Sequence, residues 1–71
     1  MNKNEINTHA INAIIELIDD ATENNYSIND DDFADVADIM LNDSEIAHSD
    51  NDLQLISDTM IAYCDERNIA H

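Results

Sequence analysis

The chain contains neither glycine nor proline, and this absence limits its possible folds more than any other feature of the sequence. Hairpins and sharp turns depend on both residues, because glycine adopts positive φ angles and proline fixes φ near the value that a turn needs. Strand-rich folds require many such turns. The composition therefore predicts an all-α protein whose helices are joined by short segments of Asn, Asp and Ser.

The length of 71 residues is enough for one domain, and we expect a single helical domain over residues 1–71. Apolar residues make up 44% of the chain and include eleven isoleucines. Disordered chains are usually poor in such residues, so this chain is able to build a core in spite of its charge.

Apolar residues recur at helical spacing from Asn4 to about Glu23 and predict the first helix. Ile11 and Ile15 widen its apolar stripe to a little over half of the helix circumference. Two neighbouring helices do not easily cover so wide a stripe, so we expect a homodimer through this helix. A polar break follows at residues 24–27, where Asn suits a helix C-terminus because it tolerates the left-handed conformation.

A second helix is predicted to start near Ser27 or Asn29 and to run to about Leu41. Asn29 is a suitable N-cap, and the acidic residues after it lie where the helix dipole favours negative charge. One side of this helix forms a charged ridge made of Asp31, Asp35, Asp38 and Asn42. The opposite side is expected to face the core with Phe33, Val36, Ala37, Ile39 and Met40.

Residues 42–52 are predicted to form a linker, within which we allow one short helical turn capped by Ser44. Ser49 and Asp52 have the spacing of a capping box for a third helix, with Asp in place of the usual Glu. This helix is expected to end near Asn68. Three antiparallel helices with short connections predict a small three-helix bundle.

The formal charge of the chain is -15, from 17 acidic residues and two basic residues, Lys3 and Arg67. Anionic membranes and nucleic acids repel such a chain, because binding to them depends on Lys and Arg. The chain also lacks nearly all of the Glu–Lys pairs that stabilise ordinary helices by about 0.2–0.5 kcal/mol each. We therefore expect either a high-salt habitat or a basic partner to compensate, unless the charge serves solubility alone.

A basic partner would normally hold DNA or RNA in the groove that this protein occupies. Carboxylates at i, i+4 and i+7 lie about 5 Å apart along a helix axis, which is sparser than the phosphates of one DNA strand at about 3.4 Å. Rows from two helices or two protomers would approach that density. Occupation of the groove would inhibit the partner competitively, and opposite charge would speed the association.

In length, acidity and the Asp-rich segment at residues 29–38, the chain resembles the small acidic inhibitors of phages and mobile elements, such as anti-CRISPR and anti-restriction DNA mimics. The resemblance covers the composition of the whole chain and rests on no shared motif, so it assigns no role to single residues. It implies a basic target such as a CRISPR effector, a restriction enzyme or a nucleoid protein. From the charge pattern we expect the partner-binding residues to be Asp30, Asp31, Asp32, Asp35, Asp38 and Asp43, with Asp50 and Asp52 as secondary contacts.

We expect a cytoplasmic protein. Cys64 is the only cysteine, so the chain has no disulfide framework of the kind found in small secreted domains. The polar start of the chain has no apolar segment of a signal peptide, and no apolar run approaches the ~20 residues that cross a bilayer.

Enzymatic and metal-binding functions find little support, and we expect neither, nor any cofactor. Glu45 and His48 have the i, i+3 spacing of di-iron sites, but the additional Glu ligands have no evident source. The EF-hand calcium loop requires a glycine, which the chain lacks. Cys64 lies on an apolar stripe, where a thiol is usually a small core residue with a raised pKa.

The principal alternative function is a homodimeric helical adaptor whose charge serves only solubility. Such a module would bind through an apolar groove or through Leu55, which falls outside the apolar stripe of the third helix. Salt distinguishes the two functions, because only binding to a basic surface weakens steeply with ionic strength.

Overall fold

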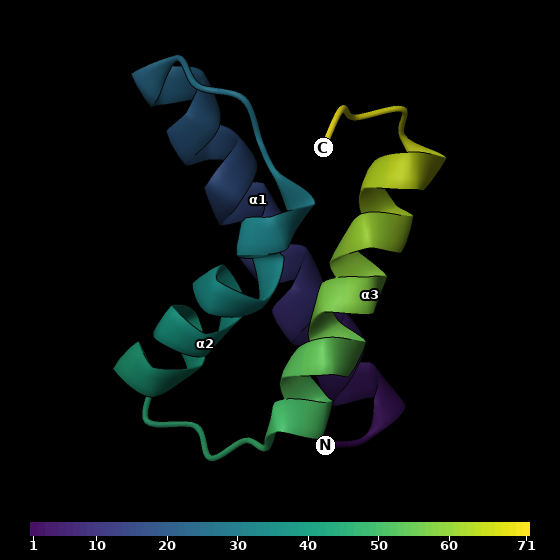
Figure 1. The fold of residues 1–71 in the computed structure, drawn as a ribbon. Coiled ribbons are helices and arrows are strands. Elements are labelled where there is room, and N and C mark those ends of the chain that lie inside the picture. Colours follow the sequence, from purple (N-terminus) through teal and green to yellow (C-terminus); the bar gives the residue numbers. More distant parts are fainter.

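A computed structural model describes all of residues 1–71 and contains three α-helices and one 3-10 turn (Figure 1). In chain order they are α1 (Lys3–Asn24), η1 (Asp30–Asp32), α2 (Phe33–Asp43) and α3 (Asp50–Glu66). The prediction of an all-α three-helix bundle is confirmed.

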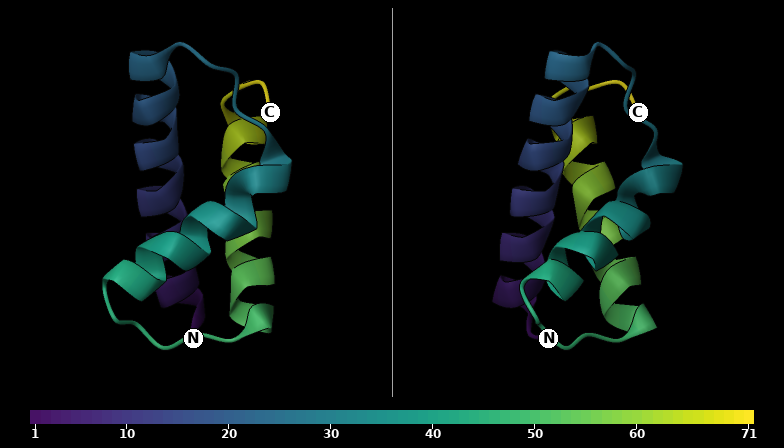
Figure 2. Two further views of the ribbon diagram at one scale, coloured as in Figure 1. Left: turned by 60° about the vertical axis from the view of Figure 1, so that its left-hand side comes forward. Right: turned by 90° about the vertical axis from the view of Figure 1, so that its left-hand side faces the viewer.

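The three helices alternate in direction along the chain. α1 and α3 run side by side in the same direction, and α2 crosses them obliquely in the opposite sense (Figure 2). Every pair of helices is in contact, and α1 and α3 form the most extensive pair. The connection from α1 to η1 returns the chain along the bundle, so the C-terminal half of α1 faces the start of α2.

The helix ends are set by the capping residues of the sequence. Ser49 and Asp52 form the predicted capping box of α3, because each side chain accepts the backbone N–H of the other, at 3.1 and 3.0 Å. Asn2 and Glu5 form a second capping box at the start of α1, at 2.8 and 3.1 Å. Asn25 ends α1 in the left-handed conformation, with φ 57° and ψ 52°, as the polar break predicted.

The start of the second helix differs from the prediction. The side chain of Asn29 accepts the backbone N–H of Asp31 at 3.0 Å and caps η1, and regular α-helix begins only at Phe33. An Asx-type bond to the residue two positions ahead favours a tight turn over an α-helical start. The three consecutive aspartates therefore lie on a 3-10 turn and do not extend α2.

The short helical turn that was allowed in the linker is absent. Residues 46–49 have no regular structure, and Glu45 adopts the left-handed conformation at φ 57°. The N–H of Ile46 then donates to the carbonyl of Leu41 at 2.9 Å, which closes the end of α2. Once the chain has turned in this way, it cannot start another helix from Ser44.

The core is built from all three helices, and the apolar residues assigned to it are buried or partly buried with one exception. Ile39 is 60% exposed, so its predicted core position is wrong. At 100° per residue, Ile39 lies about 120° around the helix from Phe33, beyond the edge of the buried face. The largest fully buried side chains are Ile14, Phe33, Ile56, Met60 and Cys64.

Removing one methylene group should lower the free energy of unfolding at a core isoleucine and leave it nearly unchanged at a surface isoleucine. We expect Ile56→Val to lower the free energy of unfolding by about 0.5–1.5 kcal/mol, because Ile56 is completely buried. Ile39→Val is the matched control and should change it by less than about 0.5 kcal/mol. Urea denaturation followed by circular dichroism measures both, and equal losses would contradict this packing.

Candidate functional site

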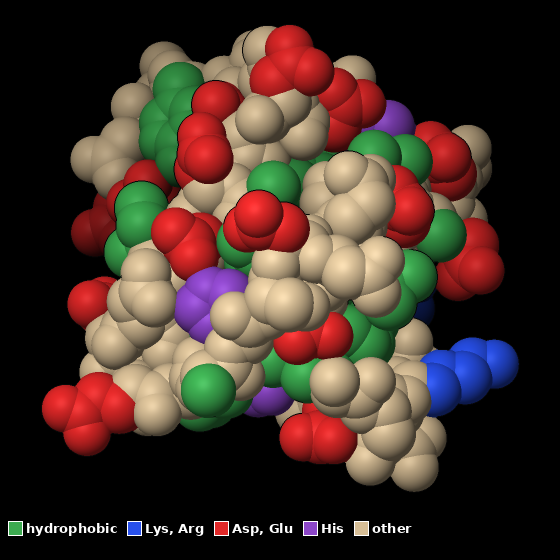
Figure 3. Space-filling view, turned by 60° about the horizontal axis from the view of Figure 1, so that its bottom comes forward, with side chains coloured by type: hydrophobic (Ala, Val, Ile, Leu, Met, Phe, Trp, Pro, Cys, Tyr) green, Lys and Arg blue, Asp and Glu red, His purple; other side chains and the backbone are tan.

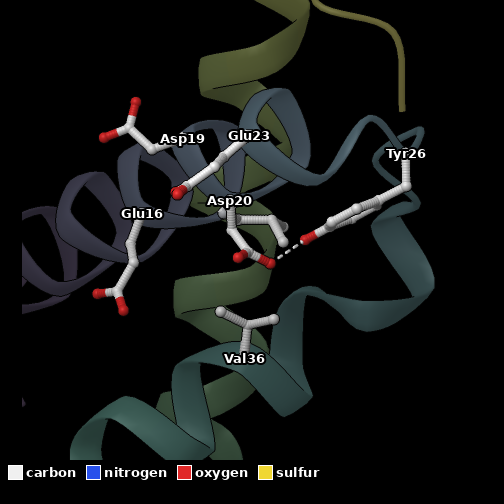
Figure 4. Close-up of a pocket in the computed structure, with 7 residues that line it drawn as sticks. Glu16, Asp19, Asp20, Glu23, Tyr26 and Val36 are labelled. Atoms are coloured by element: carbon white, nitrogen blue, oxygen red, sulfur yellow. Dashed lines mark hydrogen bonds between the residues drawn. The ribbon is translucent and has the colours of Figure 1, made fainter.

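Four carboxylates of α1 line a hollow of about 410 Å³ against the start of α2 (Figure 4). They recur at i, i+3, i+4 and i+7, so they share one face of the helix. Leu17 and Val36 give this hollow apolar walls. The four carboxylates belong to Glu16, Asp19, Asp20 and Glu23.

A second hollow of about 480 Å³ extends the first along the seam between α1 and α2. The two share Glu16 and Asp19, and the second also contacts Ile15 and Met40. The two hollows therefore adjoin, with acidic residues along α1 and apolar residues from both helices. We call these two hollows the acidic groove.

Tyr26 connects the polar break after α1 to the acidic groove. Its hydroxyl donates to Asp20 Oδ2 at 2.7 Å, and the two side chains point toward each other across the hollow (Figure 4). This hydrogen bond, together with the charges of Asp20 and Asp32, raises the pKa of Tyr26. Asp32 ends η1, so this turn adds negative charge directly before the start of α2.

The eight aspartates predicted as partner-binding residues do not form one ridge. Asp43, Asp50 and Asp52 lie around the α2–α3 connection, away from η1 at the other end of α2 (Figure 1). Red acidic side chains spread over that end of the molecule, with blue basic groups only at its edge (Figure 3). Five of the eight are free of side-chain hydrogen bonds or ion pairs and well exposed: Asp31, Asp32, Asp35, Asp43 and Asp50.

The other three predicted aspartates are bound by positive groups of the chain itself. These contacts join segments that are distant in the sequence, so they contribute to the fold. They are Asp38–His48 at 2.6 Å, Asp30–His71 at 3.0 Å and Asp52 with the Met1 amine at 3.2 Å.

His48 holds the α2–α3 connection against α2. Its Nδ1 lies 2.8 Å from the carbonyl oxygen of Ile46, and its Nε2 lies 2.6 Å from Asp38 Oδ1. Both partners are acceptors only, so both bonds form together only when the imidazole is protonated on both nitrogens. The bond to Ile46, followed by the bond to Asp38, raises the pKa of His48.

His71 joins η1 to α3 in the same way. Its Nε2 lies 2.7 Å from Asp65 Oδ1 and its Nδ1 lies 3.0 Å from Asp30 Oδ2. These bonds, with Asp65 the larger contributor, raise the pKa of His71. The ring also packs near Phe33, with 6.1 Å between ring centroids. His71 therefore closes the end of the bundle over a core residue.

Asp52 has a structural role, although it was predicted to contact a partner. The Ser49 N–H and the Met1 amine both donate to its carboxylate and lower its pKa, and its side chain is 13% exposed. Cys64 is fully buried, and this burial raises the pKa of its thiol, as expected for a core cysteine. Across the chain, His, Cys, Asp and Glu side chains nowhere gather in a group of three or more that could hold a metal ion.

The four groove carboxylates of α1 were not among the predicted site residues. Their i, i+3, i+4, i+7 spacing is visible in the sequence and could have identified them as a row. The middle third of the chain has the highest density of acids, and this drew the prediction to residues 30–52. Only the fold shows that the α1 row lies against α2.

Comparisons with known proteins identify no relative, since no protein family, curated protein or solved structure matches this chain. Neither α1 nor the shorter helices are apolar enough over a sufficient length to cross a membrane.

The two histidine bridges predict that stability falls as the pH rises from about 6 to 8. Each folded-state pKa is raised above the ordinary value of 6.5. The stabilisation is therefore complete below that value and is lost as the pH rises through the folded-state pKa. The midpoint of thermal unfolding, followed by circular dichroism across this range, measures the effect.

Two variants provide the internal comparison for this pH dependence. His48→Gln combined with His71→Gln should flatten the profile, whereas His9→Gln should keep it, because His9 belongs to neither bridge. A wild-type midpoint that climbs with pH over this range would contradict the assignment.

Proposed function

We propose that this protein is a cytoplasmic inhibitory binding protein whose acidic groove occupies a basic, nucleic-acid-binding surface of another protein. The supporting observation is that this groove holds four carboxylates and no basic side chain. Arg67 lies elsewhere, 3.7 Å above the ring of Tyr63 on α3. The negative charge of the groove is thus left for a partner to neutralise.

The mixed lining of the groove suits Lys and Arg side chains. Their aliphatic stems pack on apolar surface while their charged ends seek carboxylates. Leu17, Val36 and Met40 supply the apolar surface, and the α1 row supplies the carboxylates around it. A row of basic side chains on a partner would therefore find both kinds of contact at once.

The spacing of the α1 row supports mimicry of a phosphate backbone. Its four carboxylates span seven residues, or about 10 Å at a rise of 1.5 Å per residue. The mean spacing of the four is therefore about 3.5 Å along the axis, and one DNA strand carries a phosphate every ~3.4 Å. The row is therefore as dense as a strand, whereas the predicted ridge of i, i+4, i+7 aspartates is sparser.

The exposed aspartates extend this acidic surface beyond the groove. By helical spacing, Asp43 follows Val36 and Met40 along the edge of α2 that faces α1. Asp31 and Asp35 point further away from α1 and would contact the edge of a bound partner. Asp30, Asp38 and Asp52 already bind positive groups of the chain, so we assign them a smaller part in partner binding.

The charge of the protein supports one class of target. A groove that normally binds DNA or RNA, in a CRISPR effector, a restriction enzyme or a nucleoid protein, has the required density of Lys and Arg. We propose competitive inhibition, with no chemistry at the acidic groove and no cofactor.

Affinity capture tests this proposal. The protein, immobilised at low salt, should retain from a nuclease-treated lysate of the source cell a basic protein that added double-stranded DNA releases. Binding should also weaken steeply as the salt concentration rises. Retention that survives both DNA and high salt would contradict the proposal.

Paired charge removals locate the binding surface on the captured partner. Asp19→Asn with Glu23→Gln should weaken binding about tenfold, because exposed ion pairs contribute up to about 1 kcal/mol each. Asp58→Asn with Glu66→Gln removes the same charge from α3 and should change affinity much less. Isothermal titration calorimetry measures both, and equal losses would show that net charge, not the groove, determines binding.

The alternative function, an adaptor that binds through apolar surface, has one observation in its favour. Ile11, Ile15 and Leu55 are 41%, 45% and 43% exposed. An adaptor of this kind would hold its partner through these side chains, so its affinity would change little with salt.

A further inference from the structure

One long face of the molecule is almost uncharged, although the chain carries a formal charge of -15. Along α1 this face follows Asn7, Ile11, Ile18 and Thr22, which recur at spacings of four and seven residues. Next to it, α3 presents Thr59 and Ala62, which line the same hollow as Asn7 and Ile11. We call the surface formed by these six residues the neutral face.

Two hollows lie along the neutral face, and both are nearly free of charge. The one between α1 and α3 measures about 290 Å³, and its only charged residues are Glu66 and Arg67, which lie 3.7 Å from each other. The one beside Ile18 and Thr22 measures about 430 Å³ and has no charged residue in its wall. The face can therefore approach another acidic surface with little repulsion.

Apolar side chains are exposed on and beside this face. Ile11 lies on it, and Leu55 precedes Thr59 by one turn of α3. Ile15, one turn beyond Ile11, lies at its border with the acidic groove. These three account for most of the large hydrophobic side chains that are exposed on the whole molecule. The exposure of Ile11 and Leu55 at a nearly uncharged surface indicates that a partner covers them.

We propose that the neutral face binds a second copy of this chain. Two copies of a strongly acidic protein repel each other wherever carboxylates meet, and the only carboxylate in the two hollows of this face, that of Glu66, is paired with Arg67. The face also offers apolar contacts, since Ile11 lines one of its hollows and Leu55 is exposed beside it. A two-fold axis would place Ile11 and Leu55 of each copy against the neutral face of the other.

The size of the face sets the strength of this dimer. The strip from Asn7 to Thr22 is about 22 Å long, and two helices side by side are about 20 Å wide. The buried area is then about 900 Å² in total, below the range of about 1,200–2,000 Å² that stable interfaces show. We therefore assign a weak dimer, which is populated at micromolar or higher concentrations.

The dimer leaves the acidic grooves accessible. The α1 carboxylate row lies about 130° around the helix from the neutral face, at 100° per residue. Each copy would thus present its own groove to a basic surface. The dimer does not depend on the proposed function, because it uses other residues. Charge also acts in the opposite sense, since it opposes the dimer and favours binding to a basic target.

Sedimentation equilibrium of the full chain at about 20 mM and 300 mM NaCl tests the dimer at concentrations up to several hundred micromolar. Added salt should tighten self-association by screening the repulsion between the copies, whereas it should weaken binding to a basic target. Ile11→Glu should raise the dimer dissociation constant at least about tenfold, because it places a carboxylate in an apolar contact.

Ile39→Glu is the matched control, since it adds the same charge at an exposed isoleucine of α2 and should leave the dimer unchanged. Circular dichroism establishes that each variant is folded, and Ala62→Glu replaces Ile11→Glu if the latter unfolds. A wild-type chain that stays monomeric at the highest concentration and salt overturns the proposal. So does a dimer that these substitutions on the neutral face leave intact.

Discussion

The shortage of positive charge is the constraint on which the structure depends. The chain has two basic side chains and 17 acidic ones, so the usual ion pairs between helices are not available. The chain uses other positive groups instead. The Met1 amine binds Asp52, His48 binds Asp38, and His71 bridges Asp30 and Asp65. Each contact joins two different segments, and the two histidines reach from irregular segments to helices. The apolar core drives the packing, and these contacts fix the connections around it.

Once these contacts are made, the remaining charge is unevenly distributed. Four carboxylates of α1 line the acidic groove against α2, whereas the surface shared by α1 and α3 has scarcely any charge. If acidity served solubility alone, neither the acidic groove nor the uncharged surface would be expected, because solubility gains nothing from carboxylates that gather in one groove. If both proposals hold, the two surfaces respond oppositely to salt, and the protein would bind its target best at low ionic strength and itself best at high ionic strength.

Local signals in the sequence predicted the local structure. Apolar spacing gave the three helices, and Asn25, Ser49 and Asp52 were recognised as residues that end or start them. Contacts between residues that are distant in the sequence could not be predicted in this way. His71 lies 41 positions from Asp30, and no periodicity indicates that they meet. Hence three of the predicted partner-binding aspartates proved to have partners within the fold. The α1 row at residues 16–23 was readable as a row, but its position against α2 was not.

The most direct measurement of the central claim is an NMR titration of the ¹⁵N-labelled protein with a short oligoarginine peptide at low salt. The peptide carries the charge of a basic groove without its shape, so it reports where the protein itself prefers to bind cations. The account predicts that the backbone shifts concentrate at residues 16–23, at Tyr26 and at residues 31–36. Shifts spread evenly over all acidic residues, with Asp58 and Asp65 moving as much as Asp19 and Glu23, would contradict it.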